Sequence, residues 1–279
     1  MIEIYGLKKI YDNRVEALKK ITAKILRKRT AIIGRNGAGK TTLIRILSTQ
    51  LMPTSGYALI NGLNILKDEE EIRKKVSCIP QEARPVGLLT PYEHILIYLT
   101  ARGYSFKNAS EEARKALKDV NLWENRNTPT DELSGGMKRK LFVAMALASN
   151  AELVFLDEPT TGLDPLSRLE VWTAIKGLGS DLVLTTHYME EAQSLADELI
   201  FMEDGTIIKQ GTAEEVLSEF KGKVRVESRK PVEGWKKAGG LYIKYVDSEE
   251  AHEYVKMGYD VKQITLEDLF LKYGVEIES

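Results

Sequence analysis

Short apolar runs alternate with segments of helical spacing through most of the chain. Residues 153–156 and 182–186 are short apolar runs of the kind that forms buried parallel strands. Two similar runs lie at residues 30–33 and 76–79. Apolar residues at helical spacing occur between them, for example at residues 43–47. This alternation of strands and helices predicts an α/β fold.

The opening of the chain has a different pattern. Residues 2–33 read as short strands joined by turns, with a hairpin-type turn at Asp12 and Asn13. Residues 57–60 read as a further strand, which a turn at Asn61 and Gly62 ends. The pattern predicts an N-terminal antiparallel β subdomain beside the mixed sheet of the α/β fold.

The middle of the chain, about residues 82–150, is mainly helical. Thr90 and Glu93 have the spacing of a capping box ahead of an apolar helix at residues 94–101. A second helix is predicted to begin at Ser110. We interpret this part as a helical lobe. The apolar helix fits either the core of that lobe or a docking surface for another protein, and the sequence leaves both open.

The last part of the chain has its own pattern, which begins after about Glu219. We therefore predict a small α+β domain over residues 218–279, after an α/β domain over residues 1–217. The expected elements of the small domain are strands at residues 223–227 and 241–246 and helices at residues 248–256 and 264–271.

A glycine-rich segment joins the predicted strand at residues 30–33 to the helix after it. It runs from Gly34 to Thr42 and reads Gly-Arg-Asn-Gly-Ala-Gly-Lys-Thr-Thr. Glycines let successive main-chain N–H groups point at one anion, and the following helix aims its positive end at the same place. Lys40 can reach the terminal phosphates, and the hydroxyl of Thr41 can ligate Mg²⁺. The context of strand, loop and helix predicts a phosphate-binding P-loop.

Two acidic residues come directly after the apolar run at residues 153–156. Ligands of doubly wound sheets bind at the carboxyl ends of the strands. There Asp157 can orient Mg²⁺ through a water, and Glu158 can act as a general base on an attacking water. His187 follows the strand at residues 182–186, so we expect it near the same phosphate.

A second helix start without bulky side chains lies at Ser134, Gly135 and Gly136. The N–H groups of a helix N-terminus favour anions. By itself this segment would be an ordinary cap and loop. Beside a P-loop, it gives the chain two helix ends suited to phosphate.

The composition narrows the class of protein. The chain has 41 acidic and 40 basic side chains among 279 residues, so its net charge gives no reason to expect nucleic acid as a partner. No apolar stretch approaches the roughly 20 residues that cross a bilayer, and we expect no signal peptide. Cys78 is the single cysteine, which suits a reducing cytosol, and it is expected to be a small core residue.

The ordered set of segments resembles the nucleotide-binding subunit of an ATP-binding cassette (ABC) transporter over about residues 1–217. Walker A corresponds to Gly34 to Thr42, the Q-loop to Gln81, the signature motif to Leu133 to Met137, Walker B to Leu153 to Asp157 with Glu158 as the catalytic glutamate, the D-loop to Gly162 to Asp164, and the switch histidine to His187.

The resemblance implies a head-to-tail dimer, in which each ATP lies between the P-loop of one subunit and the signature motif of the other. The nucleotide-binding residues that it implies are Tyr11, which would stack on adenine, and Gly34, Arg35, Asn36, Gly37, Ala38, Gly39, Lys40, Thr41 and Thr42. The residues that would act on the partner's nucleotide are Ser134, Gly135, Gly136 and Met137 of the signature, with Asp164 in the D-loop. The implied catalytic residues are Glu158, His187 and Gln81, and the implied Mg²⁺ site comprises Thr41, Gln81 and Asp157.

One residue departs from the family pattern. The signature usually ends in Gln, and here Met137 takes that place. We expect a weaker polar contact near the ribose with hydrolysis retained, whereas a low turnover would indicate that Met137 impairs the site.

The closing residues 265–271 resemble the tail of ATPase subunits from type-2 ABC exporters. The implied protein is an ATPase at the cytoplasmic face of the membrane. Its partners would be a second copy or a paralogous ATPase, and separate transmembrane permease subunits contacted near residues 81–103. The alternative is a soluble ABC ATPase without a transport role, such as the iron–sulfur assembly type, which lacks this tail. The sequence does not identify the transported molecule.

Overall fold

The computed structural model describes residues 1–238 and 240–273, and the chain folds into two compact units, Met1–Gln210 and one that begins at Gly211. The sequence places the domain boundary after residue 217 instead, and that boundary stays a prediction. Within the described ranges, no helix is long and apolar enough to cross a membrane.

The first unit contains a six-stranded sheet with parallel pairing from β6 through β7, β8 and β3 to β9. Parallel strands end at the same edge of a sheet, so the segments that follow β3, β6, β7 and β8 are brought together there. In sheet order the strands are β10 (Thr206–Gly211), β9 (Glu198–Glu203), β3 (Arg29–Ile33), β8 (Asp181–Thr186), β7 (Leu153–Asp157) and β6 (Val76–Ile79).

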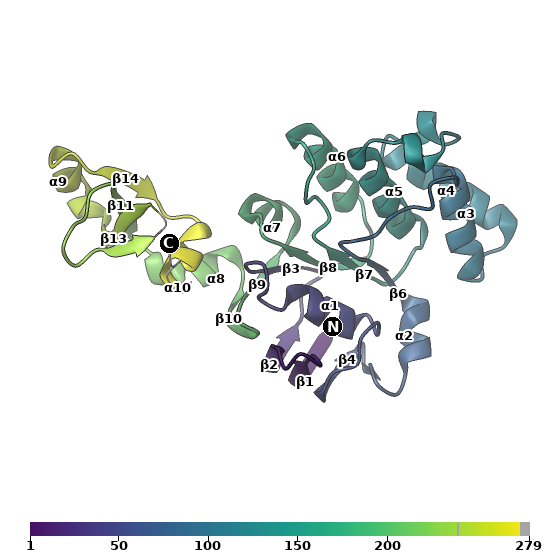
Figure 1. Ribbon diagram of the computed structural model, residues 1–279, viewed down its shortest axis with the longest axis horizontal. Coiled ribbons are helices and arrows are strands. Elements are labelled where there is room, and N and C mark those ends of the chain that lie inside the picture. The colour runs from purple at the N-terminus through teal and green to yellow at the C-terminus, as the bar shows by residue number, and fades with distance from the viewer. Residues whose placement is uncertain (239, 274–279) are drawn as a thin grey trace. The chain divides into compact units, whose positions relative to one another are not determined.

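A separate antiparallel sheet forms from the N-terminal segment, as the sequence predicts. Its inward side chains, such as Ile4 and Leu18, join a buried cluster with Leu43 and Ile44 of the helix α1 (Lys40–Leu47) and Phe155 of the six-stranded sheet. Figure 1 shows α1 on one side of the six-stranded sheet, and α5, α6 and α7 on the other. In sheet order the antiparallel strands are β2 (Glu16–Ile25), β1 (Ile2–Ile10), β4 (Ser55–Ile60) and β5 (Leu63–Asn64).

The helical lobe follows the prediction with one corrected boundary. Thr90 forms the expected capping box with Glu93. The second helix of the lobe begins at Phe106, after the N-cap Ser105, and not at Ser110. Its first turn is polar apart from the exposed Phe106, so the apolar periodicity of the sequence starts too late to mark it. The helices of the lobe are α3 (Pro91–Ala101), α4 (Phe106–Asp119) and α5 (Gly135–Ala148), with 3-10 turns at Trp123–Asn125 and Thr130–Glu132. A further helix, α2 (Glu69–Lys75), comes before β6 and is not part of the lobe.

Two further helices complete the first unit. The helix α6 (Pro165–Lys176) is capped by Asp164, whose carboxylate accepts hydrogen bonds from the N–H groups of Leu166 and Ser167. The helix α7 (Met189–Leu195) follows β8 and was not predicted from the sequence. Cys78 is partly buried against the core, and burial raises the pKa of its thiol, so it remains protonated as a small core side chain.

The second unit is an antiparallel sheet with short helices. The sequence predicts β11 (Lys223–Ser228) and β13 (Leu241–Asp247) but not the two edge strands, β12 (Lys236–Ala238) and β14 (Asp260–Gln263). Both edge strands are short and rich in charged residues, so they have no apolar alternation. The helical segments are α8 (Ala213–Leu217), α9 (Ala251–Lys256) and α10 (Glu267–Tyr273), with 3-10 turns at Ser218–Phe220 and Ser248–Glu250.

Asp268 on α10 is the centre of a buried polar network in the second unit. One of its carboxylate oxygens accepts hydrogen bonds from Arg225 Nη1 at 2.7 Å and from the hydroxyl of Tyr245 at 3.0 Å, and the other accepts from the N–H of Thr265 at 2.7 Å. The Asp268 side chain is fully buried. Burial and the neighbouring carboxylate raise the pKa of Tyr245, so its hydroxyl stays protonated and remains a donor.

Replacing Asp268 with alanine is expected to destabilise the second unit by about 2–4 kcal/mol, because Arg225 Nη1, the hydroxyl of Tyr245 and the N–H of Thr265 lose their common acceptor, although Arg225 keeps its ion pair with Glu227 at 2.8 Å. Amide hydrogen exchange in urea, followed on peptides of the second unit, measures the effect. Asp260→Ala, at an exposed position on β14, is the matched control. The double variant Asp268→Ala with Arg225→Met should recover part of the loss. Equal stability of Asp268→Ala and the control would contradict the assignment.

Candidate functional site

A hollow of about 560 Å³ lies at the carboxyl ends of the parallel strands. It gathers residues from five separate parts of the first unit, namely the N-terminal segment, the glycine loop with the start of α1, and the segments after β6, β7 and β8. The residues that line it are Val15, Ala17, Asn36, Gly37, Ala38, Gly39, Lys40, Thr41, Thr42, Gln81, Glu158, Thr161 and His187.

The glycine loop joins β3 to α1 and presents the N-terminus of α1 to the hollow. Gly39, the N-cap of α1, has φ +97°, and a Cβ there would lie 2.5 Å from the carbonyl oxygen of Ala17. Glycine is therefore required by both the backbone conformation and the space. The positive end of the helix dipole and the unpaired N–H groups of the first turn face this side, which suits an anion.

Lys40 is almost fully buried beneath the loop. Its ammonium group donates hydrogen bonds to the carbonyl oxygens of Gly34 at 2.8 Å and Arg35 at 3.1 Å, and lies 3.3 Å from Glu158 Oε1. The side chain is thus held in one position with its charge directed to the floor of the hollow. A cation in a site of low dielectric interacts strongly with an anionic ligand.

Oxygen ligands for a hard cation lie beside Lys40. The hydroxyl of Thr41 donates to Asp157 Oδ1 at 3.1 Å, and the hydroxyl of Thr185 donates to the same oxygen at 2.5 Å. Asp157 is the last residue of β7 and is buried. A hydroxyl and a carboxylate at this spacing are the kind of donor set that Mg²⁺ uses together with phosphate oxygens and water.

Glu158 is surrounded by the other predicted catalytic residues. Gln81 Nε2 donates to Glu158 Oε2 at 3.2 Å, the hydroxyl of Thr161 donates to the same oxygen at 3.0 Å, and His187 Nδ1 lies 3.3 Å from it. Glu158 has the left-handed backbone conformation (φ +48°), which is unfavourable for a residue with a side chain. Its N–H donates to the carbonyl and hydroxyl oxygens of Thr185, which helps to hold this conformation.

Tyr11 lies near the hollow but outside its lining. Its hydroxyl is 3.1 Å from the hydroxyl of Thr42, and the ammonium of Lys9 lies 5.4 Å from the centre of its ring. Val15 and Ala17 form the corresponding wall of the hollow. The sequence did not single out either residue, because small apolar side chains after a turn carry no distinctive chemistry.

The signature segment lies at the start of α5, and its residues are not among those that line the hollow. Ser134 caps the helix by accepting a hydrogen bond from the N–H of Met137. A Cβ at Gly136 would lie 2.8 Å from the hydroxyl of Ser167 on α6, so glycine permits the close packing of these two helices. Asp164 caps α6, and hydrogen bonds from Ser167 hold its pKa below the usual range.

Two residues that the sequence analysis missed form hydrogen bonds to the segment that carries Glu158, outside the lining of the hollow. Arg139 on α5 donates to the main-chain carbonyl oxygens of Asp157, Glu158 and Pro159 at 2.7–2.8 Å. Glu191 on α7 is fully buried and accepts hydrogen bonds from Thr160 at 2.7 Å and from Trp172 Nε1 at 2.9 Å. Burial raises the pKa of Glu191. A charged residue on an amphipathic helix normally faces solvent, so sequence pattern alone does not reveal such contacts.

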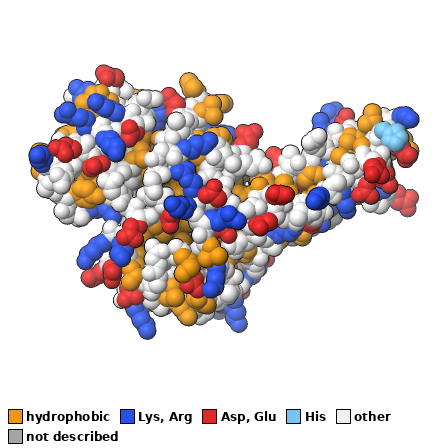
Figure 2. Space-filling view, turned by 180° about the vertical axis from the view of Figure 1, so that it is seen from behind, with side chains coloured by type: hydrophobic (Ala, Val, Ile, Leu, Met, Phe, Trp, Pro, Cys, Tyr) orange, Lys and Arg blue, Asp and Glu red, His pale blue; other side chains and the backbone are white. Residues whose placement is uncertain are grey.

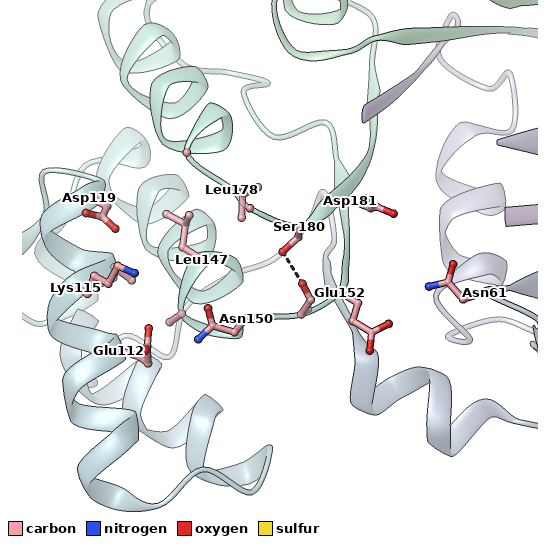
Figure 3. A pocket seen from close by; sticks show the side chains of 15 residues that line it. Asn61, Glu112, Lys115, Asp119, Leu147, Asn150, Glu152, Leu178, Ser180 and Asp181 are labelled. Atoms are coloured by element: carbon pink, nitrogen blue, oxygen red, sulfur yellow. Dashed lines mark hydrogen bonds between the residues drawn. The ribbon is translucent and has the colours of Figure 1, made fainter. Parts of the chain in front are cut away.

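A second hollow of about 660 Å³ lies at the amino ends of β7 and β8, beside α4 and the end of α5 (Figure 3). Its lining includes the acidic residues Glu112, Asp119, Glu152 and Asp181 and one lysine, Lys115. None of the predicted site residues lies there. The predicted chemistry therefore belongs to the first hollow.

Comparison with known proteins was made by sequence and by structure. The profile of the family described as "ABC transporter" matches residues 18–161. The daunorubicin/doxorubicin resistance ATP-binding protein DrrA of Streptomyces peucetius is 36% identical over 225 residues, which cover 78% of this chain and 67% of that protein. The retinal-specific phospholipid-transporting ATPase ABCA4 of Mus musculus is 40% identical over 185 residues, which cover 66% of this chain but only 8% of that protein.

Among solved structures, the ATP-binding cassette MJ0796, described as a post-hydrolysis dimer bound to ADP and Pi, matches with a TM-score of 0.69 and 25% identity. The match covers 76% of this chain and 98% of that one. The predicted P-loop NTPase fold is confirmed by this likeness. The chain belongs to the ABC transporter family and carries its ATPase domain.

Proposed function

We propose that this chain binds and hydrolyses ATP and thereby powers an ABC exporter. The observation that carries the proposal is the meeting of Lys40, Gln81, Glu158 and His187 at one hollow, although these residues come from four separate segments. Lys40 and the N–H groups of the glycine loop would bind the phosphates. Glu158 would accept a proton from the attacking water, His187 would hold the γ-phosphate and Glu158 in the reactive geometry, and Gln81 would contact the γ-phosphate and Mg²⁺.

Mg²⁺ is the proposed metal. Thr41 and Asp157 supply adjacent oxygen atoms, and Gln81 can add an amide oxygen after a rotation of its side chain. When bound with ATP, the ion would neutralise charge on the phosphate oxygens. The hydrogen bond from the hydroxyl of Thr185 to Asp157 would hold the carboxylate of Asp157 in position to orient the cation.

A second copy, or a paralogous ATPase, is proposed to complete each site. The hollow is open on one side, and Ser134, Gly135 and Gly136 lie elsewhere in the same unit, at the exposed N-terminus of α5. The neighbouring helix α6 exposes Leu166 and Leu169. Contact with a partner would cover these side chains and bring a second helix N-terminus to the γ-phosphate, which excludes water from the reaction.

A membrane permease is the second proposed partner, at the cytoplasmic face of the membrane. Within the predicted contact region, residues 81–103, the segment after Gln81 exposes Val86 and Leu88, and α3 exposes Ile97. Such apolar side chains on a surface favour protein contact. The face in Figure 2 carries acidic and basic side chains intermixed.

The alternative of a soluble ABC ATPase without a transport role is less well supported. The relatives named above are described as a drug-resistance ATP-binding protein and a phospholipid-transporting ATPase. Those descriptions favour the exporter assignment. The transported molecule would be selected by the permease, and co-purification of a membrane protein with this chain would identify it.

Hydrolysis by the purified chain is expected to require Mg²⁺ and to depend on dimer formation, because one copy supplies only half of each site. Phosphate release is measured over a range of protein concentrations, with light scattering on the same samples. Activity per subunit should rise with the fraction of dimer and vanish in EDTA. Full activity per subunit in samples that scatter as monomers would overturn the dimer proposal, and activity that EDTA leaves unchanged would overturn the Mg²⁺ site.

A further inference from the structure

Arg139, on the second turn of α5, makes five hydrogen bonds to main-chain carbonyl oxygens. Nη2 donates to Asp157 at 2.8 Å and to Glu158 at 2.7 Å, and Nε donates to Pro159 at 2.7 Å. Nη1 makes two longer bonds, of 3.4 Å each, to Pro80 and Gln81. One side chain thus connects α5 to the ends of both β6 and β7.

The geometry requires an arginine. Three successive carbonyl groups, of Asp157, Glu158 and Pro159, converge on the same guanidinium, and a planar fork with several N–H groups can satisfy all of them. The ammonium group of lysine has its donors at a single point and cannot reach carbonyls on both strands at once. The strained left-handed conformation of Glu158 is therefore held from the carbonyl side by Arg139, as it is held from the N–H side by Thr185.

Arg139 lies on the same helix as the signature segment, so its hydrogen bonds connect that segment to the catalytic residues. Ser134 caps the same helix, so the signature segment and Arg139 are parts of one rigid element. A shift of α5 would move the guanidinium and, with it, the main chain at Glu158 and Gln81. The two neighbours of Arg139 on the helix have other contacts, Lys138 with the carbonyl oxygen of Asp131 and Lys140 with the carboxylate of Glu170.

We propose that Arg139 is a positioning residue that holds the main chain at Glu158 and Gln81 in the geometry needed for hydrolysis. This inference rests on the proposed ATPase function. It assigns to Arg139 no contact with the nucleotide. Its loss should therefore slow the chemical step and leave ATP affinity nearly unchanged.

Arg139→Lys and Arg139→Ala test the proposal against Lys138→Gln, a neighbouring change outside the carbonyl cluster. In steady-state assays, Arg139→Lys is expected to lower kcat about 100-fold, the size of effect that a small displacement of a catalytic group produces. The Kd for ATP, measured by calorimetry, should stay within about threefold of wild type. Arg139→Ala should lower kcat at least as much as Arg139→Lys does. The positive charge that lysine retains should not restore kcat, because lysine lacks the planar guanidinium group. Lys138→Gln should behave as wild type.

Amide hydrogen exchange without nucleotide gives a readout that is independent of hydrolysis. Peptides that cover residues 80–82 and 157–161 should exchange faster in Arg139→Lys than in wild type, while peptides from the second unit stay unchanged. If wild type hydrolyses no ATP, the proposed function fails and this experiment still decides the positioning role. Exchange at wild-type rates in both peptides, or a kcat within threefold of wild type for Arg139→Lys, would overturn the inference.

Discussion

Glu158→Gln is expected to abolish ATP turnover and to trap an ATP-bound dimer. Glutamine keeps the size of the side chain but cannot accept the proton of the attacking water, so we expect a loss of about 100- to 10,000-fold in kcat. ATP would still bind, because Lys40 and the glycine loop are unchanged. In the proposed mechanism, hydrolysis would release the two subunits, so a block at that step should leave them together.

Phosphate release and size-exclusion chromatography with light scattering, in excess Mg-ATP, check both parts of this expectation. Glu111→Gln is a matched control, because Glu111 is an exposed carboxylate on α4. The control should keep its turnover and elute as wild type does. A Glu158→Gln protein that hydrolyses ATP normally would exclude Glu158 as the base, and one that remains monomeric in excess Mg-ATP would contradict the dimer.

Lys40→Ala is expected to remove most of the affinity for ATP. The ammonium of Lys40 is buried and aimed into the hollow, and charge-assisted hydrogen bonds of this kind contribute about 1.5–3 kcal/mol each. Loss of about 3 kcal/mol corresponds to a Kd more than 100-fold higher. The variant also leaves the buried Glu158 carboxylate without its cationic neighbour, so some loss of stability should accompany the loss of binding.

Calorimetric titration with Mg-ATP measures the affinity, and thermal unfolding checks that the variant remains folded. Lys67→Ala, at an exposed position after β5, is the control and should bind as wild type does. An unchanged Kd in Lys40→Ala would mean that the loop does not hold the phosphates in the way proposed.

The site could be predicted from sequence where its chemistry depends on neighbours in the chain. The segment from Gly34 to Thr42 joins a strand to a helix directly, so its geometry follows from local rules. The capping box at Thr90 was predictable for the same reason. Asp157 and His187 needed one further rule, namely that parallel strands bring their carboxyl ends to one edge.

The rest depended on contacts between distant segments. Arg139 acquires its role because α5 packs beside the ends of β6 and β7, and no spacing within the signature segment encodes that contact. The edge strands β12 and β14 are defined by pairing with β13 and β11 and lack an apolar pattern of their own. The start of α4 was misplaced because its first turn is exposed, so hydrophobic periodicity carries no signal there.

The residues at the start of α10 differ in their exposure to solvent. Leu266, Asp268 and Leu269 are shielded from solvent, whereas Glu267 lies on the outside of α10. A protein that docked there would meet Glu267 and never the carboxylate that gives this tail its character. The buried side chains of this helix therefore stabilise the second unit, and a binding partner would contact its outward-facing side chains, such as Glu267.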